Sequence, residues 1–133
     1  MLFFCTYFDS NYLVRALPMI WSLARYCDTP FRLYALCLDE SAQTALEKLQ
    51  LPSVIPIPLA RLEATDRDLL AVKNQRSRVE YYFTATPCWI HYLLQQFPEI
   101  DRLTYLDADL YFYSSVRPIW EEMAGASILV IPH

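Results

Sequence analysis

Glycine is almost absent from this sequence. Its 133 residues include one glycine, Gly125, whereas an average usage of about 7% predicts roughly nine. A phosphate-binding P-loop needs two glycines and the dinucleotide-binding fingerprint needs three. Both motifs are therefore excluded, and any nucleotide that the protein binds must be held in another way.

Histidine is scarce, and the cysteines are scattered. His91 and His133 are the only histidines, which excludes a clustered-histidine zinc site and leaves little for a histidine-based catalytic triad. The cysteines form no CxxC pair and stand among apolar neighbours; they are Cys5, Cys27, Cys37 and Cys88. We expect buried free thiols in a reducing compartment, because a disulfide framework is not expected in a chain of this length.

Excess positive charge and long apolar runs are also missing. The formal net charge is −4 and the isoelectric point is about 5.0, so the sequence offers no basic face for nucleic acid. No apolar run approaches the roughly 18 residues of a transmembrane helix, and the N-terminus lacks the basic segment of a signal peptide. We expect a cytoplasmic protein with no transmembrane segment and no nucleic-acid partner.

The residues that are present suffice for one folded domain. Hydrophobic residues make up 55% of the chain and charged residues 20%, which excludes a disordered chain. The length is that of a single domain, and a chain of this size buries roughly two thirds of the surface that its unfolded form exposes.

Apolar runs alternate with segments of helical spacing. Strands are predicted over residues 2–7, 31–38, 54–57, 102–106 and 127–131. Helices are predicted over residues 12–26, 39–49, 79–97 and 117–123, with short helical turns within 59–73 and an exposed loop over 74–78. Pro18 is expected to kink or restart the first helix, and the third should be helical on both sides of Pro87. The alternation predicts an α/β layer fold with a mainly parallel sheet.

Two carboxylates, Asp107 and Asp109, directly follow the strand predicted over 102–106. Ligands of open α/β sheets bind at the carboxyl ends of strands, and side chains two residues apart in extended backbone point the same way. Two carboxylates crowded together repel unless a cation lies between them or one is protonated, and oxygen ligands suit Mg²⁺ or Mn²⁺. The alternative is a surface turn whose aspartates face water.

These residues resemble a motif of a known family. The segment Tyr105-Leu106-Asp107-Ala108-Asp109-Leu110 is similar to the DxD motif of nucleotide-sugar glycosyltransferases of the GT-A fold, in particular the branch of glycogenin and the lipopolysaccharide galactosyltransferases. Other similar features follow in the same order: the strand that leads into Thr6, Tyr7 and Asp9, then Tyr12 at the head of the first helix, and Pro118-Ile119-Trp120 after the motif.

The resemblance implies a three-layer, Rossmann-like GT-A fold with a mainly parallel sheet. Residues 1–133 would be the donor-binding part of a single domain, and the acceptor-binding part would be absent. The implied activity is metal-dependent transfer of a sugar from a nucleoside-diphosphate sugar, such as a UDP-sugar, to a hydroxyl of a glycan, a lipid-linked sugar or a protein. Because the predicted final strand has no closing helix, we expect a truncated domain with negligible transfer activity by itself.

The resemblance also implies site residues. Asp107 and Asp109 would hold Mn²⁺ or Mg²⁺, and this ion would bind the donor's diphosphate. The residues implied in nucleotide binding are Thr6, Tyr7, Asp9, Tyr12 and Ala108, the last near the ribose. The family places a basic residue on the helix before the motif; residues 84–94 contain none, and Arg78 or Arg76 is expected to substitute from the loop. No catalytic residue is assigned.

Other interpretations remain open. The chain could be a truncated domain that binds nucleotide sugar weakly or not at all, or a phosphohydrolase with an aspartate nucleophile, although that motif normally lies near the N-terminus and continues with small residues. Thr6 and Asp9 could equally form a strand-end turn and a helix N-cap.

Overall fold

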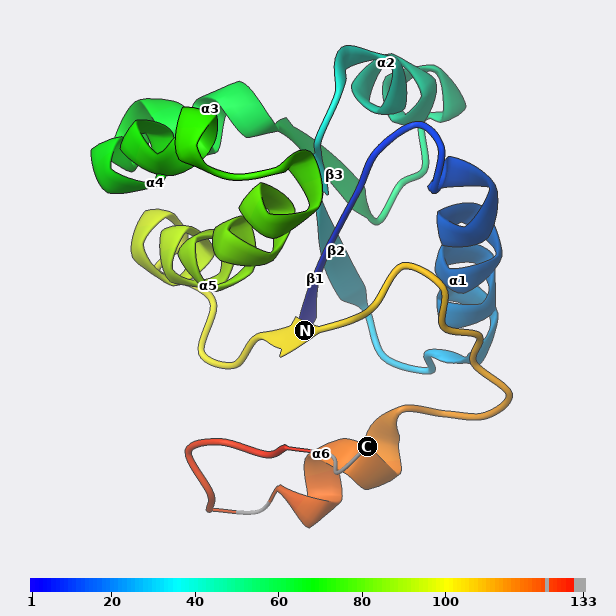
Figure 1. Ribbon diagram of the computed structural model, residues 1–133. Coiled ribbons are helices and arrows are strands. Elements are labelled where there is room, and N and C mark those ends of the chain that lie inside the picture. Colours follow the sequence, from blue (N-terminus) through cyan, green and yellow to red (C-terminus); the bar gives the residue numbers. More distant parts are fainter. Residues whose placement is uncertain (124, 131–133) are drawn as a thin grey trace.

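Four parallel strands form the centre of the structure, in the order β3-β2-β1-β4 (Figure 1). This computed structural model describes residues 1–123 and 125–130. The strands are β1 (Leu2–Phe8), β2 (Phe31–Cys37), β3 (Val54–Pro58) and β4 (Thr104–Tyr105). β1 and β2 are nearly continuous apolar runs, as expected of parallel strands that are covered on both faces.

Helices cover both faces of this sheet, which gives three layers (Figure 1). They are α1 (Leu13–Tyr26), α2 (Glu40–Leu49), α3 (Leu59–Thr65), α4 (Arg67–Val72), the short 3₁₀ helix η1 (Lys73–Gln75), α5 (Arg78–Gln96) and α6 (Arg117–Glu122). Because side chains alternate along a strand, Phe4 and Phe8 of β1 pack with α1 and α2. Cys5 packs on the opposite face with Trp89 and Leu93 of α5.

The connections between strands determine where the sheet can bind a ligand. The chain passes from β1 through α1 to β2 and through α2 to β3, and then returns by α3–α5 to β4 on the other side of β1. The strand order therefore changes direction between β1 and β4. In open α/β sheets, such a switch point leaves a crevice outside the carboxyl ends of the two strands.

The segment that follows β4 runs beside α1 (Figure 1). The hydroxyl of Ser22, which is buried within α1, accepts a hydrogen bond of 3.1 Å from the backbone N–H of Phe112 and donates one of 2.9 Å to the carbonyl of Met19. Farther along, Arg117 pairs with Asp28 at 3.1 Å. These contacts fix the path of the chain directly after Asp109.

The predicted elements agree with the structure except at Pro18, in the loop predicted over 74–78 and near the C-terminus. α1 and α5 run without interruption through Pro18 and Pro87. The first helix therefore does not restart at Pro18, and the predicted helix on both sides of Pro87 is confirmed. Both prolines are exposed, and so are Val14 and Phe83, the residues four positions earlier. The carbonyls that lose their N–H donor therefore lie on the solvent side of each helix, where water can satisfy them.

Two predicted strands differ in the structure. β4 contains Thr104–Tyr105 rather than 102–106. Residues 127–130 form no strand, since no described residue pairs with them in a ladder, and Ile131 of that prediction lies outside the described residues. An apolar run alone does not make a strand, because its backbone also needs a hydrogen-bonded neighbour. Within the described ranges, no helix has the length and hydropathy of a membrane span.

Substitutions of Leu23 and Val14, both on α1, test which face of this helix contributes to the free energy of unfolding. Leu23 is fully buried whereas Val14 is 71% exposed. We expect Leu23→Ala to lower the free energy of unfolding by about 2–5 kcal/mol, because it leaves a cavity between α1 and the sheet. Val14→Ala should change it by less than about 0.5 kcal/mol. Equal urea midpoints for the two variants would contradict this packing.

Candidate functional site

A pocket of about 570 Å³ lies at the switch point between β1 and β4. This is within the size range of small-molecule and cofactor sites. Three parts of the chain line it: the loop after β1, the segment that contains the two aspartates, and the start of α5. The lining residues are Tyr7, Phe8, Asp9, Asn11, Tyr12, Leu38, Arg78, Val79, Tyr82, Phe83, Tyr105, Asp107, Ala108 and Asp109.

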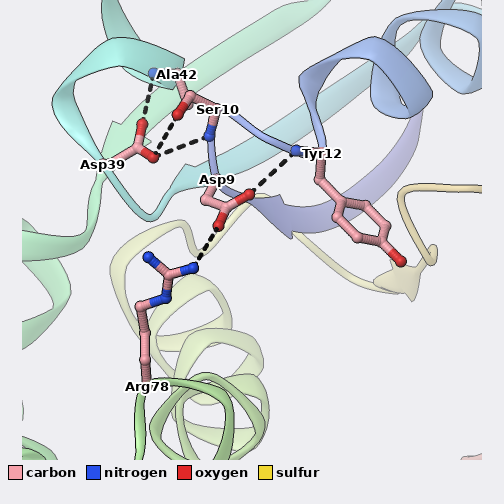
Figure 2. A network of polar contacts seen from close by, with 6 residues as sticks. All are labelled: Asp9, Ser10, Tyr12, Asp39, Ala42 and Arg78. Carbon is pink, nitrogen blue, oxygen red and sulfur yellow. Dashed lines mark hydrogen bonds and ion pairs between the residues drawn. The ribbon is translucent and has the colours of Figure 1, made fainter.

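Asp9 joins the loop after β1 to the start of α5. Its Oδ1 accepts a hydrogen bond of 3.1 Å from the backbone N–H of Tyr12, and its Oδ2 lies 3.8 Å from the guanidinium of Arg78 (Figure 2). The Asp9 side chain is only 12% exposed, whereas that of Arg78 is 69% exposed. The carboxylate is thus largely enclosed by the fold, whereas the guanidinium is exposed to solvent.

Asp39, which begins α2, supports the same loop from behind. Its Oδ1 accepts a bond of 2.8 Å from the N–H of Ala42. Its Oδ2 accepts bonds from the N–H and the hydroxyl of Ser10, at 2.9 and 2.8 Å (Figure 2). Burial opposes ionisation, but these bonds and the nearby Arg78 outweigh it and hold the pKa of Asp39 below its ordinary value.

Asp107 and Asp109 lie on the turn that follows β4. The N–H of Leu106 donates to the carbonyl of Cys5 at 2.8 Å, which places this turn beside the end of β1. Between the two exposed aspartates, the buried side chain of Ala108 anchors the turn. Both aspartates line the pocket.

Tyr105 orients one of these carboxylates. Its phenol donates a hydrogen bond of 3.1 Å to Oδ1 of Asp107, and its ring lies 6.0 Å from that of Tyr7. Burial, with Tyr7 and Asp107 nearby, raises the pKa of Tyr105 well above its usual range. The phenol therefore stays protonated and remains a donor to Asp107.

The first turns of α5 form the remaining wall. Arg78, Val79, Tyr82 and Phe83 share one face of the helix, since they are spaced one, three and four residues apart. Burial raises the pKa of Tyr82; Arg78 opposes this rise, and Asp9 and Asp39 add to it. The wall thus combines aromatic surface with one guanidinium.

The charges of the lining are unbalanced. The lining contains three acidic residues, Asp9, Asp107 and Asp109, whereas Arg78 is the one Lys or Arg among the described lining residues. An anionic ligand would meet a negative surface unless a cation entered with it.

The donor atoms of Asp107 and Asp109 suit a hard divalent cation. They supply carboxylate oxygens alone, which Mg²⁺ and Mn²⁺ prefer. In the part of the chain that the structure describes, no three His, Cys, Asp or Glu side chains gather as a ligand set. Mg²⁺ commonly takes one or two carboxylates and completes its coordination with water and phosphate oxygens, so this pair fits such an ion.

The structure gathers most of the residues predicted for the site. Tyr7, Asp9, Tyr12, Arg78, Ala108, Asp107 and Asp109 all line the pocket. Thr6 does not: its side chain is fully buried, and its hydroxyl has no hydrogen-bond partner. By alternation along β1, Thr6 lies on the face of Phe4 and Phe8, under α1 and α2. Arg78 lies on the first turn of α5 rather than in a loop.

Sequence reasoning missed several lining residues. Among them are Asn11, Leu38, Val79 and Tyr105. Tyr81 is buried, whereas its neighbours Tyr82 and Phe83 line the pocket. The polar segment Arg76 to Arg78 before them could have indicated this difference. A helix that begins with an exposed segment is expected to keep one face of its first turns at the surface.

The chain is similar in sequence to two known proteins. No protein-family model matches the chain. Two Bacillus subtilis (strain 168) proteins, both described as uncharacterized, are similar: YfnF is 33% identical over 127 residues and YfnD 30% identical over 130. These alignments cover 96% and 98% of this chain and 41% of either relative.

Solved structures give the fold class. Mouse xyloside xylosyltransferase 1 in its apo form aligns with a TM-score of 0.66 and 18% identity, over 92% of this chain and 48% of that one. The apo structure of the bifunctional glycosyltransferase WbbM aligns with a TM-score of 0.52 and 18% identity, over 90% and 20%. The chain has the fold of these glycosyltransferases. The predicted α/β fold class with its parallel sheet is thereby confirmed.

The lowered pKa of Asp39 predicts a pH-dependent contribution to stability. A carboxyl group whose pKa is lower in the folded state stabilises the fold above its unfolded value of about 3.9, and this contribution is lost as the pH falls through the folded pKa. Wild type should therefore exceed Asp39→Asn in free energy of unfolding at about pH 7, and the difference should shrink toward about pH 3. Urea denaturation measures it, and a difference independent of pH would contradict the assignment.

Proposed function

We propose that this pocket binds a nucleoside-diphosphate sugar, such as a UDP-sugar, together with Mn²⁺ or Mg²⁺, for transfer of the sugar to an acceptor hydroxyl. The observation that carries the proposal is the presence of Asp107, Asp109, Asp9 and Arg78 in one pocket at the switch point of the sheet. The fold shared with two glycosyltransferases supports it.

Asp107 and Asp109 would hold the divalent cation. When bound, the ion supplies Lewis-acid stabilisation of the negative charge that develops on the leaving diphosphate. The chain's own contribution is the orientation of the ligands: Tyr105 fixes one oxygen of Asp107, and Ser22 holds the chain at Phe112, three residues after Asp109. Such outer contacts commonly tune the affinity of a metal site.

The loop after β1 would receive the nucleoside. The Asp9 carboxylate can accept a hydrogen bond from a base N–H, and the rings of Tyr7 and Tyr12 offer apolar faces to a base or ribose. Ala108 adds a small side chain on the floor of the pocket, where the ribose can approach the backbone. Thr6 takes no contact in this arrangement because its side chain is buried.

Arg78 would bind the phosphates. Its guanidinium is exposed and lies at the long distance of 3.8 Å from Asp9, so exchanging this partner for a diphosphate breaks only a weak pair. A guanidinium matches phosphate oxygens in a two-pronged geometry. None of the described lining residues is a glycine. Arg78 and the cation would therefore together replace the backbone N–H groups of a glycine-rich loop.

The activity of the whole protein is part of the same proposal. The chain spans about 41% of the length of the two Bacillus subtilis relatives and 48% of the xylosyltransferase chain. We assign donor binding to the described pocket. The acceptor is specified only by its chemistry, as a hydroxyl group that attacks the donor sugar.

Calorimetric titration with UDP, in the presence and absence of Mn²⁺, tests the proposal. We expect UDP to bind with Mn²⁺ and to bind far more weakly without it. Asp107→Asn and Asp109→Asn should weaken binding by roughly 100-fold or more, since even outer-shell changes at metal sites cost about 10–100-fold. Arg78→Ala should weaken it by about tenfold, corresponding to one lost charged hydrogen bond.

Asp101→Asn is the matched control. Asp101 is exposed, lies six residues before Asp107 and does not line the pocket, so its substitution should leave the affinity within about twofold. Binding of UDP that is independent of Mn²⁺ and unaffected at Asp107 and Asp109 would overturn the proposal.

A further inference from the structure

Asp39 does not line the pocket, yet its side chain accepts three hydrogen bonds beside it. It stands between the end of β2 and the start of α2, and one carboxylate oxygen serves each side. Oδ1 caps α2 through the N–H of Ala42 at 2.8 Å. Oδ2 receives both donors of Ser10, at 2.9 and 2.8 Å, from the loop after β1 (Figure 2).

The loop needs this contact because the sheet ends before it. The last paired residues of β1 and β2 are Phe8 and Cys37, followed by one more backbone bond from the N–H of Leu38 to the carbonyl of Phe8 at 3.1 Å. Beyond that point the N–H of Ser10 is held by a side chain, that of Asp39. The residues on both sides of Ser10, Asp9 and Asn11, line the pocket.

An aspartate is the residue type that this position requires. Three donors converge on its two oxygens, and an ionised carboxylate is a pure acceptor. An asparagine has one acceptor oxygen and one NH₂ group, so when its oxygen caps α2 it presents a donor to the N–H of Ser10, which then loses its acceptor. A serine or threonine could cap the helix equally well. Its single side-chain oxygen, however, would have to reach both Ala42 and Ser10.

We propose that Asp39 is a positioning residue for the pocket: through Ser10 it fixes the loop that places Asp9 and Tyr12, without touching the ligand itself. The part of this inference that concerns the ligand rests on the proposed function. The part that concerns the loop does not, because it is a statement about the protein alone.

Amide hydrogen exchange measures the loop directly. In Asp39→Asn we expect the N–H of Ser10 to exchange at least about tenfold faster, because it loses its acceptor. The N–H of Ala42 should stay within about twofold, because asparagine still caps α2. A merely structural role as a helix cap would instead change the exchange of Ala42 and leave Ser10 unchanged.

Asp66→Asn provides the matched control. Asp66 caps α4 by accepting a bond of 2.9 Å from the N–H of Leu69, as Asp39 caps α2, but it is not among the residues that line the pocket. Asp66→Asn should leave the exchange of Ser10 and the affinity for UDP with Mn²⁺ within about twofold.

The affinity for UDP with Mn²⁺ supplies the second measurement. Asp39→Asn should weaken it by roughly fivefold to tenfold. Ser10→Ala should weaken it less, because it removes the hydroxyl bond but keeps the N–H bond to Asp39. The double variant should lose little more than Asp39→Asn alone, because both changes act on the same contact. Additive losses, or faster exchange of Ser10 with unchanged affinity, would overturn the positioning role. Unchanged exchange of Ser10 in Asp39→Asn would overturn it as well.

The two proposals fail in different ways. If wild type binds no UDP with Mn²⁺, the proposed function is wrong, and the exchange of Ser10 still decides whether Asp39 holds the loop. If wild type binds UDP with Mn²⁺ and Asp39→Asn binds it equally well with a protected Ser10, the proposed function stands and the role of Asp39 is refuted.

Discussion

The site depends on a very short strand pairing. β4 contributes two residues to the sheet and pairs with the middle of β1, and the N–H of Leu106 extends this ladder by one bond to Cys5. This contact joins segments about a hundred residues apart and brings the aspartate turn to the loop after β1. Without this pairing, the aspartate turn would not be held beside the loop after β1. The contacts from Phe112 to Ser22 and from Arg117 to Asp28 then hold the chain along α1.

Much of the fold could be predicted from the sequence because its elements are local. The apolar runs over β1 and β2 and the spacing in α1 and α5 depend on residues near each other in the chain. The predicted parallel α/β sheet is confirmed. Features that depend on neighbours in space were missed. β4 is shorter than its apolar run, no described residue pairs with residues 127–130, and Pro18 lies on a helix face that tolerates it.

The candidate site was predictable to a similar degree. Asp107 and Asp109 stand out because two carboxylates after a strand are costly unless something balances them. Thr6 was assigned to the site from its place in the sequence, but strand alternation buries it under the helices. The bridge from Asp39 to Ser10 joins positions 29 residues apart and leaves no local trace. The scarcity of glycine was also informative, because it directs attention to side chains and a cation as the means of holding phosphate.

Paramagnetic broadening by Mn²⁺ tests the central claim most directly, because it locates the ion without requiring any nucleotide. Substoichiometric Mn²⁺ should broaden the amide signals of Asp107, Ala108 and Asp109 first and those of Tyr7 and Asp9 next. The signals of Leu62 and Leu69, which do not line the pocket, should be broadened least. The broadening should disappear when Asp107 and Asp109 are both changed to asparagine. Broadening centred on any other part of the chain, or unchanged in that double variant, would contradict a cation site at the meeting point of β1 and β4.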